Sequence, residues 1–173
     1  MEEGKQRMTI RKAVPNDFDR IMEIYAIAQE FMIQSGNPNQ WGHVYPQKEL
    51  VRQDIAEGAC HVLVSDDTIC GVFALCEGEE EDYREIFDGC WLNDAPYIAI
   101  HKVAGDGRHH GIFRCIADYC KEISDNIRID THKNNLPMQK QIERNGFVRC
   151  GIIYVFDKSP RIAYQWSRTE QRQ

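Results

Sequence analysis

The chain has 173 residues, of which 42% are hydrophobic and 28% are charged, and its formal net charge at pH 7 is −6. This composition is typical of a folded domain and excludes a disordered chain, a collagen-like repeat and a membrane span, because the longest apolar run covers only residues 150–156. The acidic balance argues against a nucleic-acid surface, for which a basic stripe is expected.

The length predicts one domain covering residues 1–173, since domains usually have about 100–200 residues. The N-terminal sequence Met-Glu-Glu-Gly-Lys is followed by no apolar stretch, so we expect no secretory signal and a cytoplasmic protein. The seven cysteines are odd in number and include no Cys-x-x-Cys pair. Most of them, such as Cys70 and Cys76, lie in apolar segments, which favours buried free thiols over a disulfide framework, a zinc ribbon or a catalytic cysteine.

Residues 8–12 are predicted to form a strand, and Pro15-Asn16-Asp17 is typical of the start of a helix, with Asn16 or Asp17 as its cap. Gly36 predicts the end of this helix. The residues with the spacing expected on its buried face are Phe18, Ile21, Met22, Tyr25, Ala28, Phe31 and Met32. This part of the chain therefore predicts a strand followed by a long amphipathic helix.

The next segment predicts a second helix at residues 46–57 and then a hairpin. The two strands of the hairpin are expected at residues 61–64 and 68–75, joined by a turn at Asp66-Asp67. Residues 77–82 carry five acidic side chains, and we interpret this run as a solvated loop.

The second half of the chain alternates strands and helices. Strands are expected at residues 97–103, 127–131, 147–156 and 161–166, and helices at residues 112–124 and 137–145. The inward-facing residues expected in the first of these helices are Ile112, Ile116, Tyr119, Cys120 and Ile123. The strand–helix–strand unit implies a right-handed parallel crossover, whereas the earlier hairpin implies antiparallel pairing. We therefore expect an α/β fold with a mixed, mostly antiparallel sheet, a central parallel βαβ unit and helices on both faces.

A glycine-rich loop separates the central strand from the helix that follows it. Glycines let successive backbone N–H groups converge on an anion, the helix N-terminus adds partial positive charge, and Arg108 can bind a phosphate through two hydrogen bonds. The spacing of Gly105, Gly107 and Gly111 is one residue longer than that of a dinucleotide fingerprint. Asp130 lies about 20 residues downstream, near where a ribose-binding acid is expected. The loop predicts a phosphate site, and a nucleotide-binding βαβ protein is one hypothesis for its function.

Several segments match the motifs of one superfamily. Residues 108–113 read Arg-His-His-Gly-Ile-Phe, Asn135 is followed by Ile-Glu-Arg-Asn-Gly-Phe at residues 142–147, and Gly71 lies in a strand. Together with residues 10–13 and the helix after them, these segments resemble the GNAT superfamily of acyl-CoA-dependent N-acyltransferases, with its Gln/Arg-x-x-Gly-x-Gly/Ala pyrophosphate loop. The resemblance covers nearly the whole chain and implies a single GNAT-like acetyltransferase domain.

The resemblance implies an enzyme that transfers an acetyl group from acetyl-CoA to a primary amine, of a small molecule or a protein, by direct attack in a ternary complex. It implies a CoA site formed by Val103, Arg108, His109, His110, Gly111, Ile112, Phe113 and Asn135. We expect no metal, because adjacent histidines make a poor metal site without other ligands. We also expect no nucleic-acid or membrane partner, and a monomer or a homodimer.

His101 lies on the central strand, at about the place where many members of the superfamily carry a basic carboxylate. An ordinary histidine pKa of about 6.5 suits it to accept a proton from the attacking amine. We therefore predict His101 as the catalytic base, with a half-buried structural histidine as the alternative. A backbone N–H near Lys102 and Val103 is expected to bind the thioester oxygen.

The acceptor side is expected to use aromatic side chains from two connections, because Trp and Tyr offer an apolar face with a polar tip. They are Trp41 and Tyr45, between the first two helices, and Tyr83 and Trp91, in the long connection at residues 79–96. The alternative is that these rings cover the core beneath the loops.

Two residues depart from the superfamily pattern. Phe113 stands where Gly or Ala is usual, so the last turn of the phosphate loop is expected to differ. Ile142 stands where the superfamily usually has the Tyr proposed to protonate the departing CoA thiolate. The acid must then be another group or water, and a catalytically silent CoA-binding regulator is a further alternative.

Overall fold

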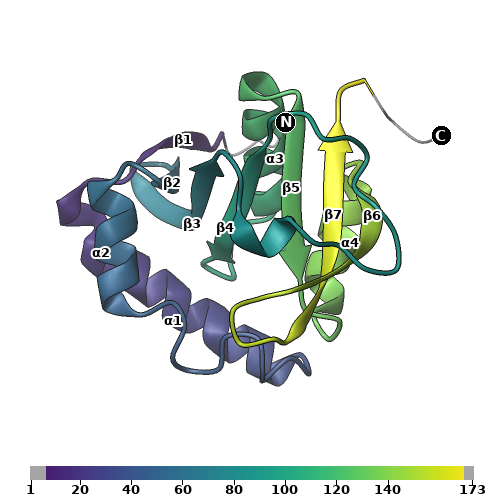
Figure 1. Cartoon of the computed structure of the whole chain (residues 1–173). Helices are drawn as coiled ribbons and strands as arrows, with labels where there is room; N and C mark the ends of the chain where they lie inside the picture. The colour runs from purple at the N-terminus through teal and green to yellow at the C-terminus, as the bar shows by residue number, and fades with distance from the viewer. Residues whose placement is uncertain (1–6, 170–173) are drawn as a thin grey trace, which may run out of the picture.

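The computed structural model describes residues 7–169, in which seven strands form one sheet with the order β1-β2-β3-β4-β5-β7-β6 (Figure 1). The strands are β1 (Thr9–Lys12), β2 (Cys60–Ser65), β3 (Thr68–Glu77), β4 (Ile98–Gly105), β5 (Asn126–Thr131), β6 (Val148–Tyr154) and β7 (Pro160–Ser167). The helices are α1 (Phe18–Gln34), α2 (Lys48–Ala56), α3 (Ile112–Ile123) and α4 (Leu136–Arg144), with short 3-10 turns at Pro15–Asp17 and Glu81–Tyr83.

The strand pairing confirms the predicted fold class. β4 and β5 are parallel, and the other neighbouring strands pair in the antiparallel sense.

Within residues 7–169 no helix is long and apolar enough to cross a membrane. The expectation drawn from residues 1–5 lies outside the described residues.

The predicted turns and helix ends are found where the backbone needs a positive φ. Gly36 follows the end of α1 with φ +92°, and Gly146 follows α4 with φ +87°. Asp66 and Asp67 join β2 to β3 with φ +49° and +62°, as a tight hairpin turn requires. These boundaries were predictable because few residues other than Gly, Asn and Asp adopt this conformation at low cost.

Asp17 is the N-terminal cap residue of α1, as expected, but its carboxylate does not bond to the helix N–H groups. It accepts hydrogen bonds from the Arg11 guanidinium at 2.7 and 3.1 Å and from the backbone N–H of Val14 at 2.8 Å. The hydrogen bond from Arg11 holds the pKa of Asp17 below its usual value. Asp17 therefore fixes the approach from β1 to α1.

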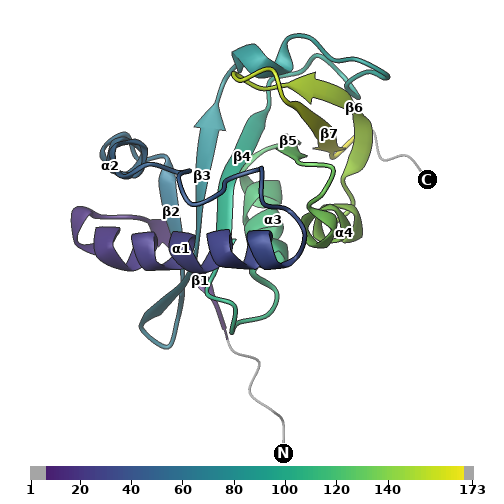
Figure 2. The same cartoon turned by 90° about the horizontal axis from the view of Figure 1, so that it is seen from below.

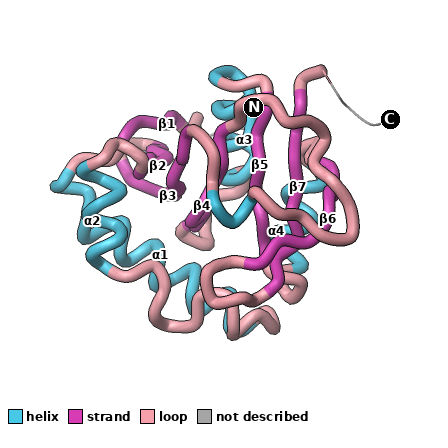
Figure 3. The backbone as a smooth tube through the Cα atoms, viewed as in Figure 1, coloured by secondary structure: helices cyan, strands magenta, loops and turns pink. Residues whose placement is uncertain are grey.

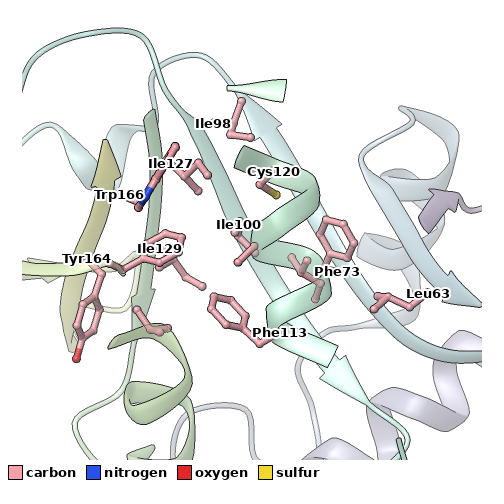
Figure 4. Packing of buried hydrophobic residues seen from close by; sticks show 14 of the residues in the cluster. Leu63, Phe73, Ile98, Ile100, Phe113, Cys120, Ile127, Ile129, Tyr164 and Trp166 are labelled. Carbon is pink, nitrogen blue, oxygen red and sulfur yellow. The ribbon is translucent and has the colours of Figure 1, made fainter. Parts of the chain in front are cut away.

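Helices cover both faces of the sheet. α3 packs on one face and forms the largest apolar core (Figure 4). Its members include Leu63, Phe73, Ile100, Phe113, Ile127, Ile129, Tyr164 and Trp166. α1 and α2 pack on the opposite face through residues such as Ile21, Val51 and Val72, and Figure 2 shows α1 crossing β2, β3 and β4. Because successive strand residues face opposite sides, Val72 and Phe73 belong to different cores.

Two expected core positions are wrong. Phe31 is 57% exposed, and Ile24 is buried in its place. Phe31 lies about 100° around the helix from the buried Met32, on the solvent side of the apolar stripe. Ile123 is 55% exposed because it is the last residue of α3, whereas Phe113 is buried at the other end of the helix.

The long connection between β3 and β4 covers the part of the sheet that α1 and α2 leave open. Figure 3 shows it as a mostly irregular segment that passes over β5 and β7. Its apolar contacts form a third core from Tyr83, Tyr97, Ala99, Ile153 and Ala163. The backbones of Phe87 and Ile152 exchange two hydrogen bonds of 2.8 Å, which tie this connection to β6.

Gly151 makes that tie possible, and it gives a test of the packing. A Cβ at Gly151 would lie 2.5 Å from the backbone oxygen of Phe87, closer than real contacts allow. We expect Gly151→Ala to lower the free energy of unfolding by about 1–3 kcal/mol, and to speed hydrogen exchange at the amides of Phe87 and Ile152. Gly78→Ala is the control, because it adds only left-handed strain, at φ +88° with no atom within 4 Å. Equal exchange protection at both amides in the two variants would contradict the tie.

Candidate active site

A cavity of about 570 Å³ opens where β4 and β5 separate. The two strands pair only at Ile98 with Ile127 and at Ala99 with Arg128, and beyond these residues they diverge. Residues of the diverging strands line the cavity: Ile100, His101, Lys102, Val103, Ile129, Asp130 and Thr131. The remaining wall comes from the end of α1 and the α1–α2 connection, the end of β3 and the β3–β4 connection, the start of α4, and the β6–β7 hairpin with the start of β7.

The bend in β4 is centred on Lys102, which has φ +54°. The pairing register between β3 and β4 shifts between Val72 and Ala74, so β4 bulges at this position. The hydroxyl of Tyr25 donates to the Lys102 carbonyl at 3.0 Å. The Lys102 ammonium lies 2.7 Å from the Asp54 carboxylate. Burial lowers the pKa of Lys102, but the hydrogen bond to Asp54 together with the charges of Tyr45, Asp54 and Cys76 outweighs it and raises the pKa overall, so Lys102 stays charged.

His101 and Glu80 form a short pair inside the cavity. The Nε2 atom of His101 lies 2.5 Å from Oε1 of Glu80, and the two side chains are 25% and 20% exposed. Burial lowers the pKa of His101, but the hydrogen bond and charge of Glu80, together with Asp130, outweigh it and leave the pKa raised. With Nε2–H donated to Glu80, the lone pair of the neutral ring is on Nδ1, so the pair can accept a proton there.

Glu80 was not identified from the sequence. The run at residues 77–82 was expected to be a solvated loop, and this interpretation is wrong for Glu80, which is largely buried against His101. Its partner His101 is 21 positions away, on β4. One acidic side chain within an acidic run gives no local signal of such a distant partner.

Asp130, the acid considered for a ribose, is bonded to a tyrosine. The hydroxyl of Tyr83 donates to Oδ2 of Asp130 at 2.6 Å. Burial, followed by the charge of Asp130, raises the pKa of Tyr83 well above its usual value, so its hydroxyl keeps its proton. Burial and the charges of Asp130 and Glu80 also raise the pKa of Asp82.

The cavity wall has more negative than positive side chains. Its carboxylates are Glu77, Glu79, Glu80, Asp82, Asp130 and Asp157, and its cations are Lys102 and Arg161 together with His101 when protonated. Since Lys102 is neutralised by Asp54, the wall favours a ligand that carries a positive charge.

Cys76 lies beside the His101–Glu80 pair. Its Sγ atom, a Glu80 carboxylate oxygen and a His101 ring nitrogen all lie within 4.8 Å of one another. Burial raises the pKa of Cys76 to about 11, so it is a neutral thiol and not a reactive thiolate. The expectation that cysteines are buried is confirmed for Cys60, Cys70, Cys120 and Cys150, but Cys90 is exposed.

The glycine-rich loop is closed by Asp106. Its carboxylate accepts hydrogen bonds from the backbone N–H groups of Arg108 at 2.9 Å and His109 at 3.0 Å, and it lies 2.7 Å from Nδ1 of His109. Among the described residues, the N–H groups of His110 and of Gly111, Ile112 and Phe113 at the start of α3 have no hydrogen-bond partner. An anion at this helix N-terminus can therefore bind these free groups, while His109 is held within the loop.

Two glycines bring the start of α3 close to the sheet. A Cβ at Gly71 would lie 3.2 Å from Cγ2 of Ile112, and a Cβ at Gly105 would lie 3.2 Å from its Cγ1. Phe113 is 4% exposed and its ring packs 6.0 Å from the ring of Phe147, so only its backbone can reach a ligand. Glycine or alanine is therefore not needed at position 113, because the ring points into the core.

Some of the other predicted site residues line the cavity, and the rest lie outside it. Trp41, Tyr45, Tyr83, Val103 and Asn135 line the cavity with His101. Asn135 also caps α4, and its Nδ2 donates to Gln40 at 3.1 Å. Trp91 takes no part in the cavity wall that the described residues form; its ring lies 4.0 Å from the Arg128 guanidinium, and its Nε1 donates to the Tyr83 carbonyl at 2.9 Å. Arg108, His110 and Gly111 are exposed around the helix start.

Solved structures of acetyltransferases share this fold. A GNAT-family acetyltransferase from Streptococcus agalactiae is 30% identical, with a TM-score of 0.85, and the match covers 94% of this chain and 96% of that one. A putative acetyltransferase from Staphylococcus aureus is 25% identical, with a TM-score of 0.66, over 92% of this chain and 99% of that one. A GNAT-family protein from Listeria monocytogenes shares the fold at 16% identity and a TM-score of 0.70, over 95% and 96%. No protein-family model and no curated protein matches the chain.

The His101–Glu80 pair gives a prediction that does not depend on activity. We expect NMR titration to show His101 with a pKa above its ordinary value of 6.5. Glu80→Gln removes the charge that raises this pKa, so the His101 titration should move to lower pH. Glu79→Gln removes an exposed neighbouring charge and should leave His101 unchanged. A His101 titration that is the same in all three proteins would show that Glu80 does not set its pKa.

Proposed function

Because the chain belongs to the GNAT family of acetyltransferases, we propose that it transfers the acetyl group of acetyl-CoA to a primary amine by direct attack in a ternary complex. The observation that carries the proposal is the His101–Glu80 pair, placed in an acidic cavity at the point where β4 and β5 diverge. Family membership favours acyl transfer over the nucleotide-binding alternative.

His101 is the proposed base. An amine with a pKa of about 10.4 is almost entirely protonated at pH 7, so attack on a thioester requires removal of a proton. His101 takes this proton on its free ring nitrogen, and the Glu80 carboxylate stabilises the imidazolium that forms. Glu80 is therefore a positioning residue that also strengthens the base. The acidic wall attracts the amine in its charged form before the proton is removed.

The divergence of β4 from β5 supports a site for the thioester. Beyond Ala99, β5 no longer pairs with β4, so backbone N–H groups around Lys102 and Val103 are available to donate to the thioester oxygen as negative charge develops on it. The free N–H groups at the start of α3 and the Arg108 side chain are the proposed partners of the CoA pyrophosphate.

The departing CoA thiolate also needs a proton. Ile142 is fully buried and aliphatic, so it supplies none. The Tyr83 hydroxyl is already bonded to Asp130. Tyr45 lines the cavity, and within residues 7–169 its hydroxyl has no hydrogen-bond partner, which makes it a candidate donor beside water. Burial raises the pKa of Tyr45, so the hydroxyl is protonated when the thiolate leaves.

We expect His101→Ala to lower turnover by about 10²- to 10⁴-fold, the usual contribution of a positioned base, with little change in acetyl-CoA affinity. Turnover should be measured by CoA release with a panel of amines, and affinity by calorimetry. Because the pKa of His101 is raised, the wild-type rate should fall as the pH drops through a midpoint above 6.5. This acidic limb should be absent in His101→Ala and should move to lower pH in Glu80→Gln.

Three results would change the proposal. Wild-type turnover and an unchanged acidic limb in His101→Ala would assign the proton to another group. Acetyl-CoA binding without transfer to any amine would favour the silent CoA-binding regulator. Stabilisation by nucleotides and not by CoA, measured as a shift in melting temperature, would favour the nucleotide-binding alternative.

A pair of variants at Gly111 tests the pyrophosphate site. Gly111 has φ +77° at the start of α3, a conformation that Asn and Asp both tolerate better than other side chains. The two differ only in charge, and Asp should repel the pyrophosphate. We expect Gly111→Asp to bind CoA roughly ten- to a hundredfold more weakly than Gly111→Asn. Equal CoA affinity in the two folded variants would place the phosphates elsewhere.

A further inference from the structure

Arg161 is a buried cation that forms no ion pair among residues 7–169. It is the second residue of β7, directly after Pro160. It lines the cavity, and it is 8% exposed. Its Nη1 donates to Oγ of Ser159 at 2.8 Å and to the carbonyl of Pro160 at 3.1 Å. Among residues 7–169, its Nε and Nη2 have no hydrogen-bond partner, and none of the ion pairs includes Arg161.

An unneutralised guanidinium at this depth is unfavourable in the free protein. Burial removes much of the water that solvates the charge, and a nearby carboxylate normally compensates for this loss. The other cation of the cavity wall, the partly buried Lys102, has such a carboxylate in Asp54 at 2.7 Å. The carboxylate nearest to Arg161 in sequence, Asp157, bonds to the backbone N–H and hydroxyl of Ser159 and not to the guanidinium. These hydrogen bonds, with a smaller contribution from the charge of Arg161, lower the pKa of Asp157. The charge of Arg161 also helps burial to lower the pKa of His132.

The position of Arg161 in the sheet separates it from the proposed CoA site. Ala163, two residues further along β7, packs with Tyr83 on the face that the β3–β4 connection covers, and alternate strand residues share a face. The intervening Ile162 packs in the α3 core. The free N–H groups proposed for the pyrophosphate belong to the start of α3, on the opposite face. An anion that pairs with Arg161 therefore comes from the acceptor.

We propose that the acetyl acceptor is an amino acid or another small zwitterion, whose carboxylate binds the free guanidinium nitrogens of Arg161 while its amine faces the His101–Glu80 pair. This inference rests on the proposed acetyl transfer to an amine. A zwitterion satisfies both parts of the wall, since its ammonium group is attracted by the carboxylates around His101 and its carboxylate neutralises Arg161. A guanidinium suits this role because it binds a carboxylate through two parallel hydrogen bonds.

The test compares amines that differ only in the carboxylate. A panel of α-amino acids and ω-amino acids is assayed by CoA release beside the corresponding carboxamides. We expect the wild-type protein to have a higher kcat/KM for acids than for their amides. Arg161→Gln should lower kcat/KM for the preferred acids by about 10- to 100-fold, the usual worth of hydrogen bonds to a charged group, and should leave the values for the amides unchanged. Arg161→Lys should retain part of the preference.

Two controls separate this role from a structural one. Arg149→Gln removes an exposed positive charge from β6 and should leave the preference for acids intact. The melting temperature of free Arg161→Gln should not fall below that of the wild type, because the variant loses an unpaired buried charge. If Arg161→Gln does not fold, the ratio of acid to amide in the wild type still decides the question.

The outcomes also distinguish this inference from the proposed function. Acids and amides acetylated equally well by the wild type, or an equal loss for both in Arg161→Gln, would overturn the role of Arg161 and leave acetyl transfer in place. Bound acetyl-CoA with no transfer to either set of amines would remove the proposed function itself, and the inference with it.

Discussion

The separation of β4 from β5 is the constraint on which the site depends. Parallel pairing stops after Ala99, and the bulge at Lys102 turns the rest of β4 away from its neighbour. The backbone accepts this strained conformation because the Tyr25 hydroxyl holds the Lys102 carbonyl and Asp54 holds its side chain. The same divergence opens the cavity and leaves the backbone groups of β4 and β5 unpaired with each other, and His101 lies on the cavity wall beside Glu80. The two covers of this face, α1 with α2 and the β3–β4 connection, meet around the gap.

Charge pairing explains how the cavity is arranged. His101 pairs with Glu80, Lys102 pairs with Asp54, and Tyr83 donates to Asp130, so most buried polar groups of the wall are satisfied within the protein. Arg161 differs because it forms no ion pair among residues 7–169, and we assign its free guanidinium nitrogens to a ligand. A buried group that lacks a partner costs free energy in the empty protein, and binding of the matching ligand recovers it. The hydrogen-bonded pairs therefore shape the cavity wall, and the charge of Arg161 indicates that the ligand carries a negative group.

The sequence predicted the elements well where their signals are local. Glycines and aspartates marked the turns and helix ends, and the glycine-rich loop marked the start of α3. Phe31 was misplaced because helical spacing gives the phase of an apolar stripe and not its width against the sheet. Glu80 was missed because its partner lies 21 positions away, on β4. The hydrogen bonds of Asp106 to its own loop depend on a backbone conformation that composition does not reveal. Local sequence patterns thus predicted the helices, strands and turns, whereas the side-chain pairs in the cavity could be identified only from the three-dimensional structure.

The two hydrogen bonds between Phe87 and Ile152 link the basicity of His101 to the order of the β3–β4 connection. Glu80 belongs to the mostly irregular β3–β4 connection. Hydrogen bonds of Phe87 with β6, and of Tyr83, Leu92 and Asn93 with β5 and β7, hold this connection on the sheet. Segments of this kind open locally at lower free energy than the whole domain. Each opening withdraws Glu80 and returns the imidazole to ordinary basicity while the sheet stays intact. Heat inactivation of this protein would then begin below the temperature at which its core melts, and it would be reversible on cooling.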